Sequence, residues 1–218
     1  MIAALIPLMH VLVFVYWLGG DLGAFYISRM ISDPARPVAA RIAAAQALAA
    51  LDMAPRTALI LTLPTGLTLA SVVGHISLPA ALLALTWGLS LSWLWLAWRI
   101  HLKHLPPGSA VRRLDLGIRW IVLAVLVGVG GAIVTGALHA PLFIGLKLLV
   151  LAAAIATGLW VRQLIAPFGP AFAALVTEGP MPQNDQIISR SLARARPAVM
   201  LIWLLLLTAA FLGFWRPQ

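Results

Sequence analysis

The stretch "LMHVLVFVYWLGGDLGAFYISRMI", residues 8–31, is apolar for almost its whole length. A helix that spans a bilayer needs about 20 apolar residues, and this stretch is long enough. The rest of the chain has the same character, since 62% of its 218 residues are hydrophobic, 10% are charged and the mean hydropathy is +1.02. A soluble domain of this size needs more polar surface, so the composition predicts an all-α, polytopic transmembrane helix bundle.

Six apolar stretches divide the chain into spans of a single domain. We expect spanning helices over residues 3–28, 54–74, 78–99, 117–138, 141–163 and 197–215. The first has no basic segment before its apolar core and no small-residue cleavage site, which predicts a retained span. The Ala-rich stretch 36–50 is a candidate interfacial helix. The chain has no cysteine, which excludes disulfides, thiolate metal sites and iron–sulfur clusters.

The basic residues predict the orientation of the bundle. Thirteen of the 15 Lys and Arg residues flank the first, third and fifth connections, and the second and fourth connections carry none. The positive-inside rule then places these basic connections in the cytoplasm and both termini on the non-cytoplasmic side. The net charge of +9 reflects this topology, with anionic lipid rather than nucleic acid as the partner. The expected location is a bacterial-type inner (plasma) membrane.

Two ionisable residues, His10 and Lys147, lie inside predicted spans, where such groups point to function by default. Helical rise puts them about 10 Å and about 9 Å below the outer ends of their helices, at matching depth. His75 and His139 fall at the outer ends of two other spans. A neutral imidazole in an apolar bundle suits an axial ligand of haem iron, which makes His10 the candidate metal ligand.

Other uses of these residues stay open. His10 also suits a hydrogen bond across a helix interface, and Lys147 suits a side chain that extends to the membrane surface. His75 and His139 fit ordinary interfacial loop residues. Asp21 is expected to pair with an arginine, and the Gly19-x-x-x-Gly23 spacing is expected to let two helices approach closely.

Four segments, in order, resemble the HemJ-type protoporphyrinogen IX oxidases. "MHVLVFVYWLGGDLGAFYISR" resembles the first helix of that family, through His10, Trp17, Gly20, Tyr26 and Arg29. "MAPRTALILTLPTGLTLA" resembles its second helix, "FIGLKLLVL" its lysine-bearing helix and "RARPAVMLIWLLLLTAAFLGFWRP" its last helix. Residues 76–135 have no counterpart, and Gly145 stands where the family has a histidine two residues before its lysine. The architecture also resembles copper resistance protein D-like membrane proteins.

The resemblance implies a haem b protein that oxidises a porphyrinogen and passes electrons to the respiratory chain. It implies His10 as an axial ligand and Lys147 as a catalytic residue of the same site. We count Trp17, His75 and His139 with them as candidate cofactor-binding residues, and a small hydrophobic substrate or a quinone entering from lipid as the partner.

Two other functions compete with a haem-dependent oxidoreductase. The outer histidines and the architecture fit a membrane transporter or copper permease, although the chain shows no internal repeat. The small-residue motifs and the few charges fit a structural subunit of a membrane complex, and a homo-oligomer is also compatible with them.

Overall fold

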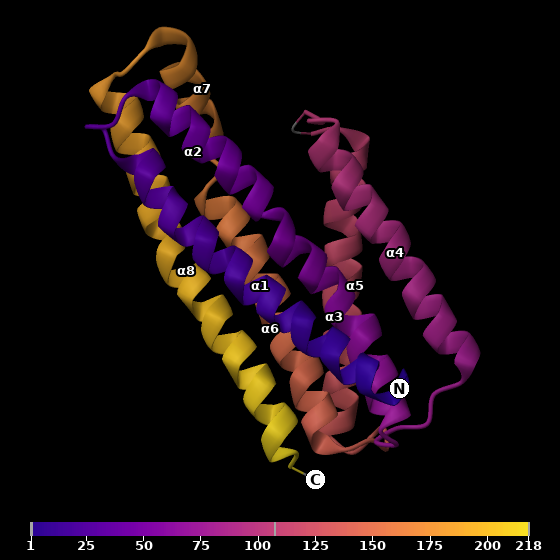
Figure 1. Cartoon of the computed structure of the whole chain (residues 1–218). Helices are drawn as coiled ribbons and strands as arrows, with labels where there is room; N and C mark the ends of the chain where they lie inside the picture. The colour runs from indigo at the N-terminus through magenta and orange to yellow at the C-terminus, as the bar shows by residue number, and fades with distance from the viewer. Residues whose placement is uncertain (1, 107, 218) are drawn as a thin grey trace.

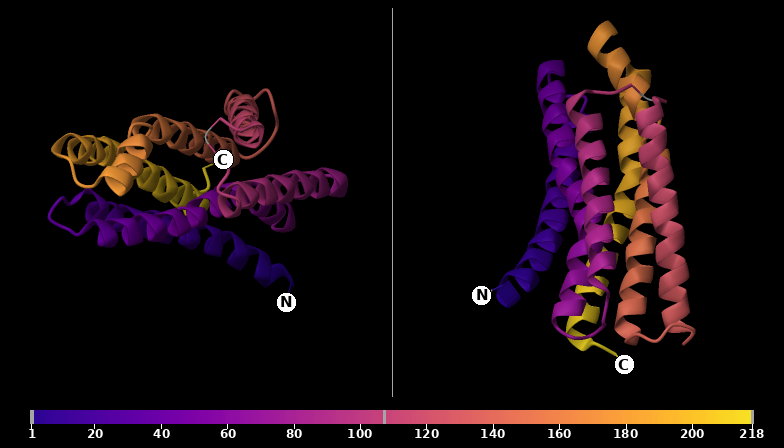
Figure 2. Two further views of the ribbon diagram at one scale, coloured as in Figure 1. Left: turned by 90° about the horizontal axis from the view of Figure 1, so that it is seen from above. Right: turned by 90° about the vertical axis from the view of Figure 1, so that its right-hand side faces the viewer.

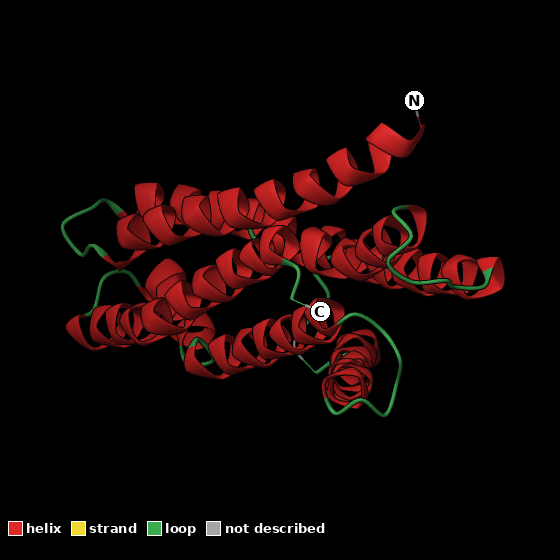
Figure 3. Cartoon of the chain, turned by 90° about the horizontal axis from the view of Figure 1, so that it is seen from below, coloured by secondary structure: helices red, strands yellow, loops and turns green. Residues whose placement is uncertain are grey.

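The computed structural model describes residues 2–106 and 108–217, with side chains from Leu5 onward. Within these ranges the chain is all-helical without strands, which confirms the predicted fold class (Figure 3). The helices are α1 (Ile2–Ser32), α2 (Val38–Leu51), α3 (Met53–Val72), α4 (Ala80–Leu102), α5 (Ala110–Val134), α6 (Leu142–Leu164), α7 (Phe168–Glu178) and α8 (Pro182–Trp215). In the described part of the chain, six helical stretches are long and apolar enough to cross a membrane.

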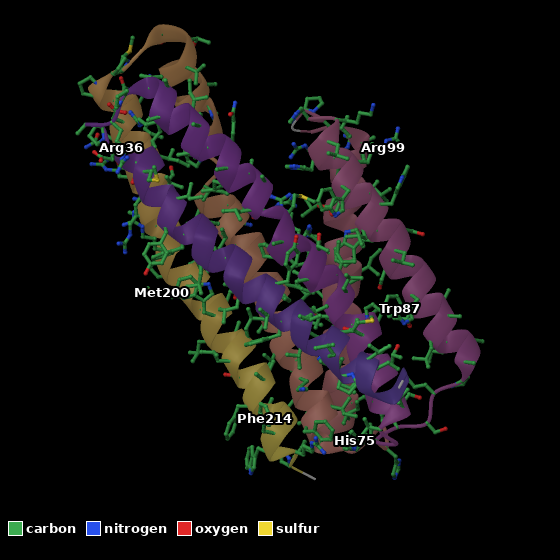
Figure 4. The ribbon with its side chains drawn as sticks, in the orientation of Figure 1. Arg36, His75, Trp87, Arg99, Met200 and Phe214 are labelled. Carbon is green, nitrogen blue, oxygen red and sulfur yellow. The ribbon has the colours of Figure 1, made fainter. Side chains whose placement is uncertain are left out.

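The two ends of the bundle differ in charge. Both termini lie at one end, together with the α3–α4 and α5–α6 connections, whereas α7 and the α1–α2 and α4–α5 connections lie at the other (Figure 1). Arg36 and Arg99 mark the second end, and His75 and Phe214 mark the first (Figure 4). The basic connections therefore share one end of the molecule, as alternating spans require. Below, these are called the basic end and the terminal end.

The last helix begins far earlier than the sequence predicts. Helix α8 starts at Pro182 rather than at residue 197, and Pro197 lies inside it. The preceding stretch, expected to be a connection, also contains α7. These segments are helical because they bury an apolar stripe against α1 and α2. The small core between the four helices consists of Ile31, Ala44, Ala171, Leu175, Ile188 and Leu192. Hydropathy over a span-length window does not detect this short, polar-flanked core.

The predicted 36–50 helix is α2, and it runs directly into α3, with Asp52 alone between them. Arg41 of α2 is 1% exposed. Its Nε donates to the Ile31 carbonyl oxygen at 2.9 Å, and its Nη1 donates to Asp185 Oδ1 at 2.6 Å. Arg41 thus joins α1, α2 and α8, although the sequence places it among the basic residues of a connection.

Glycines set the closest helix contacts. A Cβ added at Gly20 of α1 would lie 2.7 Å from Ala54 Cβ of α3, and one added at Gly145 of α6 would lie 2.8 Å from Ile133 Cγ2 of α5. Gly19 has nothing within 4 Å of such an atom, so Gly20, not the predicted Gly19, makes the α1–α3 contact. Small residues permit this approach in lipid, where packing drives association.

The main hydrophobic core lies between α1, α3, α5, α6 and α8 and includes Trp17, Ala58, Leu126, Ile155 and Ile202. Beyond it, toward the terminal end, the first part of α1 leans away from the other helices (Figure 2). The polar side chains of the candidate site lie in this half of the bundle, next to the core rather than within it.

Candidate functional site

His10 lies at the contact between α1 and α3. Its Nδ1 is 2.9 Å from Thr65 Oγ1, a residue 55 positions later in the chain. The neighbouring Gly66 makes room for the ring, because a Cβ there would lie 3.2 Å from His10 Cε1. The imidazole is half-buried, with its position fixed by one hydrogen bond and one backbone contact.

The hydrogen bonds of Thr65 determine the tautomer of His10. Thr65 Oγ1 lies 2.7 Å from the Leu61 carbonyl oxygen, to which it donates its only proton. When the hydroxyl proton is donated to the Leu61 carbonyl, the hydroxyl oxygen accepts from the imidazole, and this arrangement corresponds to the tautomer with the His10 proton on Nδ1. This leaves a lone pair on Nε2. A neutral imidazole with one N–H oriented by an acceptor is the form in which histidine ligates metals.

Lys147 of α6 reaches the same region from the other side. Its Nζ lies against α8, where a Cβ added at Gly213 would be 2.8 Å away. No carboxylate in the described ranges forms an ion pair with this amine. The charged or titratable groups with which it interacts electrostatically are Arg216 and His10. The two side chains therefore lie within electrostatic range of each other.

The other predicted site residues lie apart from this pair. Trp17 is 3% exposed in the main core, and its indole lies near the Asp21 carboxylate. His75 is half-buried, with its ring 5.0 Å from that of Phe143 in an edge-on contact. His139 is exposed in the α5–α6 connection. Over the residues that the structure describes, no three His, Cys, Asp or Glu side chains gather into a metal site.

Asp21 does not form the expected pair with an arginine in the described structure. Its Oδ2 is buried and has no hydrogen-bond partner there. The charged residue that acts on Asp21 electrostatically is Asp52, which is itself paired with Arg56 on the next turn. The close α1–α3 contact at Gly20 places Asp21 beside the junction of α2 and α3, where Arg56 has Asp52 as its partner.

One buried charge cluster was missed by sequence reasoning. Asp115 of α5 is 2% exposed and accepts from Trp93 Nε1 at 2.9 Å and from Arg119 Nε at 3.1 Å. Arg162 of α6 adds a third contact, at 3.5 Å from Oδ2. The signal in the sequence is the four-residue spacing of Asp115 and Arg119 on one helix face. Each carboxylate oxygen has a partner, so the cluster joins α4, α5 and α6.

Comparison with family models, with curated proteins and with solved structures finds no match to this chain. What the site can do therefore follows from its own groups. A free imidazole nitrogen can ligate a metal centre, and a neighbouring amine without a carboxylate can bind an acidic group. Together they suit a ligand that has both a metal and a carboxylate.

Proposed function

We propose that this chain is a haem b-binding integral membrane oxidoreductase in which His10 Nε2 is an axial ligand. The observation that carries the proposal is the hydrogen-bond chain from His10 Nδ1 through Thr65 Oγ1 to the Leu61 carbonyl oxygen. Haem b supplies a one-electron iron centre in a flat apolar ring with two propionates. Thr65 orients the ring, as the acceptors that hydrogen-bond to metal-ligating histidines do.

Lys147 completes the fit to an acidic macrocycle. Its amine lies in an apolar bundle without a paired carboxylate in the described residues, a costly arrangement unless a ligand provides the partner. A haem propionate or a substrate carboxylate supplies that partner. Gly66 and Gly213 leave the space that the two side chains occupy. Porphyrinogen oxidation in a bacterial-type inner membrane is the reaction that the family resemblance favours.

An absorption spectrum tests the proposal. Protein purified from cells with ample haem supply should show a Soret band and a haem b pyridine haemochrome, both lost in His10→Ala. The matched controls are His139→Ala and His75→Ala, which remove histidines at the same end of the bundle and should keep the band. Colourless wild-type protein, or an unchanged band in His10→Ala, would overturn the assignment.

The proposed orientation has a separate test, because the chain has no native cysteine. Single cysteines at Ala35 and at His139 lie in exposed connections at opposite ends of the bundle. A membrane-impermeant thiol reagent added to intact cells should label His139→Cys and spare Ala35→Cys. The reverse pattern would place the termini in the cytoplasm.

A further inference from the structure

A large apolar pocket lies between α3, α4 and α5, outside the His10–Lys147 site. Its volume is about 970 Å³, within the range of small-molecule sites. Its walls are mainly apolar, and residues such as Leu85, Leu89, Ile121 and Val125 line it from helix faces that are exposed in the described chain. In a membrane these faces meet lipid, so the pocket opens sideways into the bilayer.

One polar side chain faces this pocket without a partner. Ser90 of α4 is 8% exposed and lines the pocket. Two other hydroxyls on the same helix are satisfied locally, since Thr86 Oγ1 donates to the Leu82 carbonyl and Ser92 Oγ donates to the Gly88 carbonyl, each at 2.8 Å. The structure shows no hydrogen bond for Ser90 among the described residues. A buried hydroxyl left unpaired costs about 1–3 kcal/mol, which a ligand atom can recover.

The depth of Ser90 decides what the ligand is. It lies ten residues into α4, about 15 Å from the start of the helix, which is the middle of a bilayer about 30 Å thick. At that depth a phospholipid offers only hydrocarbon. The occupant must be a lipid-soluble molecule whose polar atom resides at the midplane, with an apolar body and a hydrogen-bond acceptor. An isoprenoid quinone, with a carbonyl-bearing ring on an apolar tail, has this chemistry.

We propose that the pocket between α3, α4 and α5 binds the head of an isoprenoid quinone, with the Ser90 hydroxyl as its hydrogen-bond donor. The quinone tail leaves through the opening toward lipid, past Leu89 and Val125. Trp93 lines the part of the pocket toward the basic end and is held there by its 2.9 Å hydrogen bond to Asp115.

The pocket adjoins the proposed haem site, and as a redox partner site it depends on that proposed function. Leu151 lines the pocket and lies one turn after Lys147 on α6, while Leu63 lines it and lies just before Thr65 on α3. Both leucines pack in the main hydrophobic core, so this core contributes to the wall of the pocket. Quinone binding itself does not require haem, so the two proposals are tested independently.

Photolabelling locates the quinone. The full-length protein in phosphatidylcholine nanodiscs is exposed to an azido derivative of a decyl-substituted benzoquinone, and labelled peptides are identified by mass spectrometry. The label should fall on α4 and α5 and be displaced by excess unmodified decyl-quinone but not by phosphatidylglycerol. Labelling elsewhere, or displacement by the phospholipid alone, would overturn the proposal.

Matched variants test the hydrogen bond. In equilibrium binding of the same decyl-quinone, Ser90→Ala should weaken affinity about threefold to tenfold, as loss of one neutral hydrogen bond does. Ser92→Ala, whose hydroxyl is already satisfied, should bind as the wild type does. Val125→Trp, a lipid-facing change at the opening, should abolish labelling without unfolding the protein. Equal affinities of the two serine variants would refute the role of Ser90.

The same measurement in His10→Ala separates the two proposals. Retained quinone binding in a colourless variant supports the pocket and leaves haem ligation to be judged by the spectrum. If the wild type shows a Soret band and binds no quinone, the pocket assignment fails while the haem assignment stands.

Discussion

Two polar regions of this bundle differ in whether their charged side chains have partners. The Asp115 cluster holds one carboxylate between Arg119, Arg162 and Trp93, and both carboxylate oxygens are hydrogen-bonded. The His10–Lys147 region holds an imidazole and an amine in electrostatic range, and no carboxylate of the described chain pairs with the amine. Both regions lie in an apolar bundle, but only in the Asp115 cluster do the charged groups pair with each other.

This difference distinguishes a polar cluster that stabilises the fold from a polar pair that is available to a ligand. A buried network whose members are all satisfied contributes to the fold and specifies which helices meet. A polar pair that lacks a complementary group remains costly until a ligand supplies it. The comparison predicts that substitutions in the Asp115 cluster act mainly on stability, whereas substitutions around His10 and Lys147 act mainly on ligand retention.

The largest stability effect is expected for Asp115→Asn. Removal of the carboxylate charge leaves the buried Arg119 guanidinium without its counter-charge, with the half-buried Arg162 close by, and loss of one partner of a buried pair costs about 3–5 kcal/mol. Thermal unfolding of the detergent-solubilised protein measures the loss. The control is Asp33→Asn, whose 3.3 Å pair with Arg36 is exposed and is worth about 0–1 kcal/mol. Equal melting temperatures for both variants would erase the distinction between the two regions.

Thr65→Val tests the orientation of His10. The substitution keeps the shape of the side chain and removes the acceptor for Nδ1, so haem retention should fall about 10–100-fold, as for other second-shell losses. Thr62→Val is the matched control, because the Thr62 hydroxyl donates to the Ala58 carbonyl at 2.8 Å and does not hydrogen-bond to His10. Haem titration of both variants is the measurement, and identical affinities would mean that Thr65 does not orient the ligand.

Lys147→Met should lower the free energy of unfolding by less than about 1 kcal/mol, or should raise it. No carboxylate of the described chain loses a partner, and one buried charge is removed. The haem spectrum or affinity should change instead. Lys103→Met, an exposed lysine at the basic end, serves as the control for loss of a positive charge. A marked drop in melting temperature for Lys147→Met would show that the amine has a structural partner after all.

The smallest effect is expected for Gly213→Ala. The new Cβ would meet Lys147 Nζ at 2.8 Å, but that atom ends a flexible side chain and can move, while helix propensity gains up to about 1 kcal/mol. The melting temperature should therefore be unchanged or slightly higher. Gly20→Ala is the contrasting variant, because its Cβ would meet Ala54 Cβ and Pro55 Cδ at 2.7 Å and neither can move freely. If Gly213→Ala destabilises as strongly as Gly20→Ala, Lys147 is rigidly held.

Sequence reasoning singled out both residues of the candidate site but not the contacts that hold them. The matching depth of His10 and Lys147 follows from helical rise, and the structure places them in electrostatic range. The sequence does not single out Thr65, because its contact with His10 joins positions 55 residues apart. Gly145, read as a departure from the family, packs against Ile133 and Gly130 instead. The sequence does not distinguish Asp115 either, since an i,i+4 pair with Arg119 beside other basic residues is typical of an exposed helix surface.

The sequence by itself determined the class of this protein: an all-helical membrane bundle with six apolar spans and its basic connections at one end. Hydropathy, helix length and charge act on each segment separately, so they can be read without knowing the neighbours. Only the tertiary structure decided which helices touch, that α8 begins at Pro182, and that Arg41 is buried against Asp185. In lipid, apolar faces do not by themselves select partners, and shape and hydrogen bonding between distant segments make that choice.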